Sequence, residues 1–132
     1  MNNSIFVNLP IENLVKSVDF FSELGFTFNP QFTSEDTTCM IVGENIFVML
    51  LENARFSTFV DKPIAARNFV EALIALSCES IDELRNLCEK AFTLGARRYK
   101  EPDVFPAMFG WGFEDLDGHI WELFWMDPSH IQ

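Results

Sequence analysis

The chain has 132 residues, of which 48% are hydrophobic, and a formal net charge of −11. Its length suits one domain with a substantial apolar core, and its acidity argues against nucleic acids and anionic membrane surfaces as partners, because their phosphates would be repelled. No stretch approaches the roughly 20 apolar residues of a membrane span. The first four residues lack signal-peptide features and the three cysteines lack paired spacing, so we expect a cytoplasmic, thiol-reduced protein.

The first half of the chain predicts one helix and four short strands. Residues 5–9 form an apolar run that should end at Pro10, which cannot donate to a continuing strand ladder. Apolar residues at helical spacing follow Asn13, a favourable helix cap, and Gly25 is well placed to end that helix. Later apolar runs predict three strands, at 26–32, 37–42 and 46–51.

The second half repeats this order after an irregular stretch at 52–70. An apolar run at 72–78 leads to Ser80, which begins an S-x-x-E capping box, and a second helix should end at Gly95. Three more strands are predicted, at 97–101, 107–114 and 119–126. The duplication predicts an α+β fold, a single domain over residues 1–132 built from two βαβββ modules, at 4–52 and 71–127.

The last strand carries a single acid, Glu122, among apolar residues. Strand alternation places Ile120, Glu122 and Phe124 on one face, which we expect to line a cleft, and Trp121, Leu123 and Trp125 on the other. An isolated carboxylate in an apolar strand needs a partner, because desolvating a charge is costly. Glu122 is therefore the candidate catalytic acid or base. The alternative is a carboxylate bonded to a backbone amide or Asn8, or open to solvent.

Two segments resemble the vicinal oxygen chelate superfamily, which includes glyoxalase I, bleomycin-resistance proteins, fosfomycin-resistance proteins and extradiol dioxygenases. They are FVNLPIENLVKSVDFFSELGF at 6–26 and FEDLDGHIWELFWMDP at 113–128. The resemblance covers residues 5 to 128 and implies a glyoxalase/bleomycin-resistance-like domain, often dimeric. Because this superfamily supports unrelated activities, the fold alone does not give the function.

The resemblance also implies where metal ligands would lie in members that are metalloenzymes. The ligand position of the last strand falls on Glu122, but the other positions fall on Phe6, Leu73 and the apolar run 46–50. Shifting the first strands by two residues brings Asn8 or Glu71 to the same face, still without a histidine. A divalent ion needs several converging N or O ligands, so we expect no bound metal and no cofactor.

The candidate ligand-binding residues are mostly apolar or aromatic. For the aromatic side chains among them, core packing is the alternative interpretation. The set comprises Phe6, Asn8, Val48, Leu73, Phe109, Trp111 and Phe124.

Several charged residues have structural interpretations. Arg97, Arg98 and Lys100 indicate a charged strand edge, with anion binding as the alternative. Asp115 and Asp117 are expected to form the turn before the last strand, and His119 to orient it. With only two histidines in the chain, no histidine-dependent triad can be assembled.

These observations favour a small-molecule binding protein of the bleomycin-resistance type, which takes an apolar or cationic molecule in an aromatic cleft without a metal. One alternative is an enzyme, a metal-dependent lyase, isomerase or dioxygenase that uses Glu122. The other is a structural or regulatory dimer whose cleft is vestigial. We expect a homodimer with a small-molecule ligand and with neither nucleic acid nor membrane as a partner.

Overall fold

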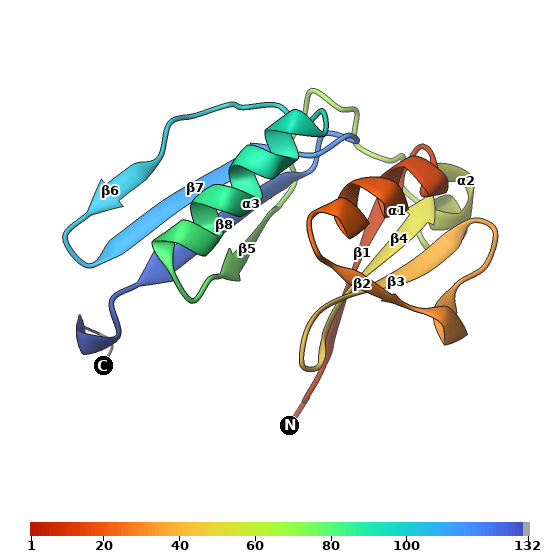
Figure 1. The fold of residues 1–132 in the computed structure, drawn as a ribbon. Coiled ribbons are helices and arrows are strands. Elements are labelled where there is room, and N and C mark those ends of the chain that lie inside the picture. Colours follow the sequence, from red (N-terminus) through yellow and green to blue (C-terminus); the bar gives the residue numbers. More distant parts are fainter. Residues whose placement is uncertain (131–132) are drawn as a thin grey trace. The chain divides into compact units, whose positions relative to one another are not determined.

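The computed structural model describes residues 1–130 and divides the chain into two compact units, Met1–Ile64 and the part from Ala65 onward. Each unit contains a four-stranded sheet and a helix that follows its first strand (Figure 1). The predicted α+β fold of two βαβββ modules is confirmed. No helix within residues 1–130 is both long and apolar enough to cross a membrane.

The first module has the strand order β1-β4-β3-β2, with β1 parallel to β4 and the other neighbours antiparallel. Short helices α2 (Asn53–Phe56), η1 (Pro30–Phe32) and η2 (Ser57–Phe59) lie outside the sheet. The main elements are β1 (Ile5–Ile11), α1 (Leu14–Glu23), β2 (Thr27–Asn29), β3 (Thr37–Gly43) and β4 (Ile46–Glu52).

The termini of α1 follow the sequence prediction, whereas the end of β1 does not. Asn13 caps α1 by accepting a hydrogen bond from the Lys16 amide at 3.0 Å, and Gly25 follows the helix with φ +101°. β1 continues through Pro10 to Ile11, so the expected stop at Pro10 was wrong. The physical reason is that β1 lies at the sheet edge, where one side of the strand has no ladder to complete.

The second module repeats this arrangement with the order β5-β8-β7-β6. Its elements are β5 (Leu73–Ser77), α3 (Ile81–Thr93), β6 (Asp103–Phe105), β7 (Met108–Glu114) and β8 (Ile120–Met126), followed by η3 (Pro128–His130). The strand predicted at 97–101 was wrong, because only Arg97 forms an isolated bridge, to Glu114. The carbonyl oxygen of Lys100 instead accepts a hydrogen bond from the Trp111 ring, which takes this segment out of the ladder.

The capping box of α3 is present in a modified form. The Ser80 hydroxyl accepts a hydrogen bond from the Glu83 amide at 3.0 Å, as predicted. The Glu83 carboxylate reaches back to the amide of Glu79 at 2.9 Å, one residue before the cap. The Glu83 amide, one of those that a helix start leaves unpaired, is therefore satisfied, and so is the amide that precedes the cap.

The helix α3 covers one face of the second sheet. The Phe92 ring of α3 meets the Trp111 ring of β7 edge-on, with 5.3 Å between centroids, and Trp121 and Leu123 of β8 are fully buried. Side chains that alternate with these belong to the opposite face, which we call the open face. The open face is formed by Leu73, Ala75, Gly110, Gly112, Ile120, Glu122 and Phe124.

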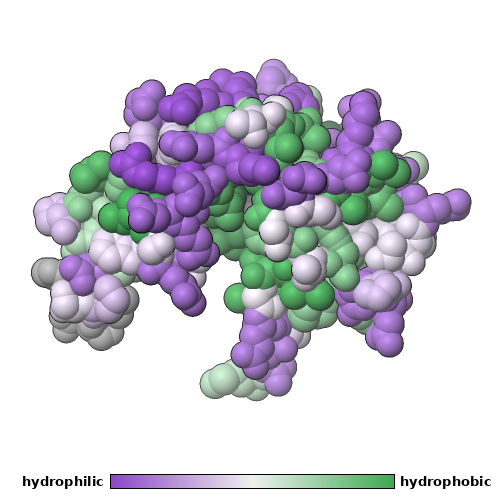
Figure 2. Space-filling view, viewed as in Figure 1, coloured by the Kyte–Doolittle hydropathy of each residue, from purple (hydrophilic) through white to green (hydrophobic). Residues whose placement is uncertain are grey.

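The first sheet is likewise covered on one side. Val48 and Leu50 are fully buried on the covered side. Phe6 and Phe47 both lie on the other side, where Phe6 is 48% exposed and the two rings stack with 4.6 Å between centroids. Asn8 shares the side of Phe6, because the two residues are two positions apart in one strand. Exposed hydrophobic side chains are visible among the hydrophilic surface in Figure 2.

Candidate functional site

Glu122 lies in the middle of β8 on the open face, as strand alternation predicted. It pairs in register with Ala75 of β5 on one side and with Gly112 of β7 on the other. Its side chain is 23% exposed, so the carboxylate is partly desolvated but still accessible. A carboxylate in this position needs donors for its oxygens.

Two side chains from the segment before β6 supply those donors. The Tyr99 hydroxyl donates to Glu122 Oε2 at 2.6 Å, and the Lys100 ammonium donates to Glu122 Oε1 at 2.7 Å. Lys100 also donates to Asp103 Oδ2 at 2.8 Å. We call these four residues the Glu122 cluster. Each oxygen of the central carboxylate has one charged or polar donor, and the ammonium is shared between Glu122 and Asp103.

The cluster can form because β7 carries a glycine opposite Glu122. A Cβ atom at Gly112 would lie 2.3 Å from Glu122 Oε2, 2.3 Å from the Trp121 carbonyl oxygen and 3.0 Å from the Tyr99 hydroxyl. The glycine therefore leaves the space in which the side chains of the edge segment and of β8 meet above β7. Gly110 adds a second position without a side chain on the same face.

The edge segment is held by the core of the module. The Trp111 ring nitrogen donates to the Lys100 carbonyl oxygen at 2.8 Å. The Arg98 guanidinium lies over the rings of Phe92 and Trp111, 4.7 Å and 5.0 Å from their centroids. These contacts fix the backbone from which Tyr99 and Lys100 reach Glu122, so the cluster is positioned by packing.

The cluster favours a neutral tyrosine and a charged lysine. Burial raises the pKa of Tyr99, and the hydrogen bond to the Glu122 carboxylate raises it further. Burial by itself would lower the pKa of Lys100, but its hydrogen bonds to Asp103 and Glu122 outweigh this and raise it overall. At neutral pH the site therefore holds an ammonium and a phenol around one carboxylate.

Tyr99 is the only tyrosine in the chain, so its ionisation can be followed directly by ultraviolet absorbance. We expect no tyrosinate signal from the folded protein near pH 10, where an unperturbed tyrosine is about half ionised. Since the folded pKa is raised, the stabilisation from this pairing is complete below about pH 10 and is lost as the pH rises further. Glu122→Gln should move the ionisation back towards the ordinary value, and the exposed-site control Glu101→Gln should not. Half-ionisation near pH 10 in the folded wild type would contradict the pairing.

The structure separates the predicted site residues into three groups. Glu122, Leu73 and Phe124 share the open face, and Phe6 and Asn8 share the side of the first sheet opposite its buried core face. The remaining three predicted residues, Val48, Phe109 and Trp111, lie instead on the buried core faces of their sheets.

Strand register explains these placements. Trp111 pairs with Leu123, and Phe109 pairs with Trp125, so both rings belong to the face that α3 covers. Val48 is buried in an uninterrupted apolar strand, where no polar alternation indicates which residues face inward. These side chains pack in the cores, in line with the alternative interpretation of the aromatic residues.

Sequence reasoning missed the two partners of Glu122. Lys100 was assigned to a charged strand edge, and Tyr99 was not singled out. A usable signal was present, because a glycine two residues from another glycine in a strand can mark a close approach of side chains. The identity of the approaching residues depends on how the segment 97–102 folds over β7, which has no local signature.

The residues near Glu122 do not fit the metal that the resemblance implies. Within residues 1–130, no group of three or more His, Cys, Asp or Glu side chains could hold a metal ion. Both Glu122 oxygens already have donors, and a divalent cation beside Oε1 would meet the ammonium of Lys100. We therefore assign no metal chemistry to this cluster.

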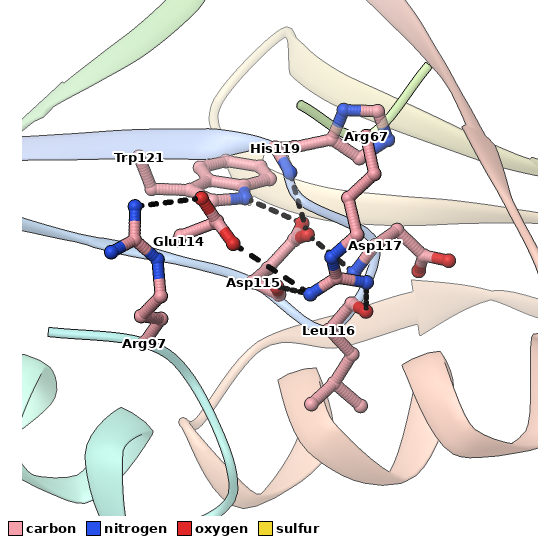
Figure 3. Close-up of polar contacts among 8 residues, drawn as sticks. All are labelled: Arg67, Arg97, Glu114, Asp115, Leu116, Asp117, His119 and Trp121. Carbon is pink, nitrogen blue, oxygen red and sulfur yellow. Dashed lines mark hydrogen bonds and ion pairs between the residues drawn. The ribbon is translucent and has the colours of Figure 1, made fainter. Parts of the chain in front are cut away.

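The turn before β8 forms a separate polar centre around Asp115 (Figure 3). Asp115 accepts hydrogen bonds from the amides of Asp117 and His119 and from the Trp121 ring nitrogen. The predicted turn-forming role of the two aspartates is confirmed. Burial raises the pKa of Asp115, and the nearby His119 and the three donors oppose that rise.

Arg67 joins the start of the second unit to this turn. Its guanidinium donates to the Leu116 carbonyl oxygen, more weakly to the Asp115 carbonyl oxygen at 3.5 Å, and lies 3.7 Å from the Glu114 carboxylate. Arg97 binds the same carboxylate at 3.4 Å. This polar centre therefore stabilises the turn before β8.

Two comparisons with known proteins bear on the family. The family model described as "Bleomycin resistance protein-like N-terminal" matches residues 3–43, which span β1 to β3 of the first module. No curated protein matches the chain.

Solved structures match almost the whole chain. Hypothetical protein SA1046 from S. aureus is 29% identical over 94% of both chains, with a TM-score of 0.79. A glyoxalase-related enzyme from Fulvimarina pelagi is 19% identical over 95% of this chain and 88% of that chain, with a TM-score of 0.79. The fosfomycin resistance protein FosX from Mesorhizobium loti is 14% identical over 98% and 96%, with a TM-score of 0.69. The structures from Fulvimarina pelagi and Mesorhizobium loti are too distant in sequence to establish more than the fold.

Proposed function

We propose that the chain is a member of the vicinal oxygen chelate superfamily, whose fold it shares, and that it binds a small apolar or cationic molecule at the open face, around Glu122. The observation that carries this proposal is a partly exposed carboxylate, held by Tyr99 and Lys100, on a sheet face that α3 leaves uncovered. Such a combination of apolar surface and a few fixed polar groups is typical of small-molecule sites.

The surroundings of Glu122 support a ligand with an apolar body. Leu73 is 57% exposed, and Phe124 is partly exposed on the same face. Gly110 adds no side chain beside Phe124, whereas the space above Gly112 is taken by Glu122 and Tyr99, so an apolar body would lie against Leu73 and Phe124. Contiguous apolar side chains that remain exposed in a folded protein favour an interaction at that surface.

A metal-dependent lyase, isomerase or dioxygenase is the alternative function. It would need further ligands beside Glu122, and the carboxylate already binds Tyr99 and Lys100. We therefore propose binding without a metal, and we retain the expectation of a cytoplasmic homodimer as part of the proposal.

Binding can be tested with 2-naphthylmethanol, a neutral aromatic alcohol, by following the amide signals of Gly110 and Gly112 in an NMR titration. We expect saturable shifts at both glycines. Leu73→Asp should weaken binding about tenfold, because it places a charge on the apolar open face. The matched control is Val104→Asp, an exposed aliphatic residue on the opposite face of the same sheet.

Two results would count against this function. Shifts that are absent at both glycines, or equal weakening by the two aspartate variants, would show that the open face is not the binding site. About one equivalent of Zn²⁺, Ni²⁺, Fe²⁺ or Mn²⁺ per purified chain, lost in Glu122→Ala, would favour the metal-dependent alternative.

A further inference from the structure

We propose that Lys100 acts as a built-in cation at Glu122 and makes the open face select uncharged ligands over cationic ones. This inference rests on the proposed function and narrows its ligand class. The starting observation is that one ammonium bridges two carboxylates, at 2.7 Å from Glu122 and 2.8 Å from Asp103. A ligand ammonium would seek the same oxygen of Glu122 that Lys100 already binds.

The tether gives Lys100 an advantage over a free cation. A group held on a short linker competes at an effective concentration in the millimolar range, without any additional contact. The backbone of Lys100 is further fixed by the Trp111 hydrogen bond to its carbonyl oxygen. A cationic ligand must therefore displace a positioned ammonium, whereas an uncharged ligand binds the apolar surface and leaves the ion pair intact.

Displacement is also opposed by charge repulsion. If Lys100 remained near Asp103, a ligand cation at Glu122 would lie beside a like charge in a partly desolvated site, where only 23% of the Glu122 side chain is exposed. The second Glu122 oxygen already accepts a hydrogen bond from Tyr99 at 2.6 Å, so a ligand ammonium would have to share that oxygen. An alcohol or phenol can still accept or donate at the edge of the cluster without adding charge.

The overall acidity of the chain does not reverse this selection. A net charge of −11 attracts cations to the whole surface, but at physiological salt such attraction is screened beyond about 8 Å. Selection between two ligands of the same shape is set by the groups in contact with them. The charges beside Glu122 therefore determine whether a cationic or an uncharged ligand is preferred, and Lys100 is the residue that supplies the positive charge there.

The test uses a matched pair of probes, 2-naphthylmethanol and 2-naphthylmethylamine, which is cationic at neutral pH. We expect the wild type to bind the alcohol more tightly than the amine. Lys100→Met should shift the ratio of the two dissociation constants at least tenfold towards the amine, because Glu122 loses its internal cation. Lys100→Gln, which keeps a donor but no charge, should shift it in the same direction.

Two controls separate the local effect from overall charge. Lys62→Met makes the same change in net charge at an exposed position and should leave the ratio unchanged. Adding Glu122→Gln to Lys100→Met should abolish the gained preference for the amine. A wild type that prefers the amine tenfold, or a ratio unmoved in both Lys100 variants, would overturn this inference while leaving small-molecule binding intact. If neither probe perturbs the open face, the inference and the proposed function both fail.

Discussion

Gly112→Ala is expected to lower the free energy of unfolding by about 3 kcal/mol. The added Cβ atom would lie 2.3 Å from both the Trp121 carbonyl oxygen and Glu122 Oε2, closer than van der Waals contact allows. Glu122 could rotate only by giving up its bonds to Tyr99 and Lys100, and the backbone carbonyl of β8 cannot move without disturbing the ladder. Urea unfolding followed by tryptophan fluorescence measures the loss.

The chain provides a matched control in the same strand. Gly110 is buried on the same face, but its Cβ atom would meet only the Leu123 carbonyl oxygen, at an ordinary contact distance of 3.7 Å. Gly110→Ala should therefore stay within about 1 kcal/mol of the wild type, since it also reduces the freedom of the unfolded chain. Equal destabilisation by the two alanines would mean that the Glu122 cluster does not crowd Gly112.

Asp115→Ala should cost about 3 to 4 kcal/mol of stability, the largest effect we expect from removing a polar side chain. Asp115 is 2% exposed and accepts from the Trp121 ring nitrogen and the Asp117 amide at 2.9 Å, and from the His119 amide at 3.0 Å. Alanine would leave three donors without their acceptor, one of them the ring nitrogen of the fully buried Trp121. Their desolvation is then uncompensated.

Thermal unfolding by circular dichroism, together with denaturant titration, measures this loss. The control is Asp61→Ala, an exposed aspartate whose replacement should change stability by no more than about 0.5 kcal/mol. The tryptophan fluorescence spectrum of the folded Asp115 variant should also change, because the Trp121 ring loses its carboxylate partner. A variant as stable as Asp61→Ala would contradict the central role of Asp115 in this turn.

Much of the fold could be predicted because its signals are local. Helix starts at Asn13 and Ser80 follow from side-chain caps within four residues, and the helix ends follow from glycines. The duplicated order of elements then indicated two βαβββ modules. The errors at Pro10 and at 97–101 both concern the edges of the sheets, where the absence of a further strand leaves pairing undecided by local sequence.

The amino-acid sequence by itself determined which residue is the unusual one. Alternation along β8 places Glu122 on the face of the sheet opposite to Trp121 and Leu123. This assignment depends only on the two-residue period of an extended strand. The same local logic assigned Asp115 to the turn. Neither conclusion requires knowledge of distant parts of the chain.

Only the tertiary structure decided what surrounds that acid. Lys100 and Tyr99 reach Glu122 from 22 and 23 residues away, across a glycine of an intervening strand. Strand register, likewise non-local, turned Trp111 towards α3 and away from Glu122. Periodicity fixes the face of a residue within its own strand, but partners across a sheet depend on register and on how an edge segment packs. The carboxylate is therefore identifiable from sequence, whereas its internal cation is not.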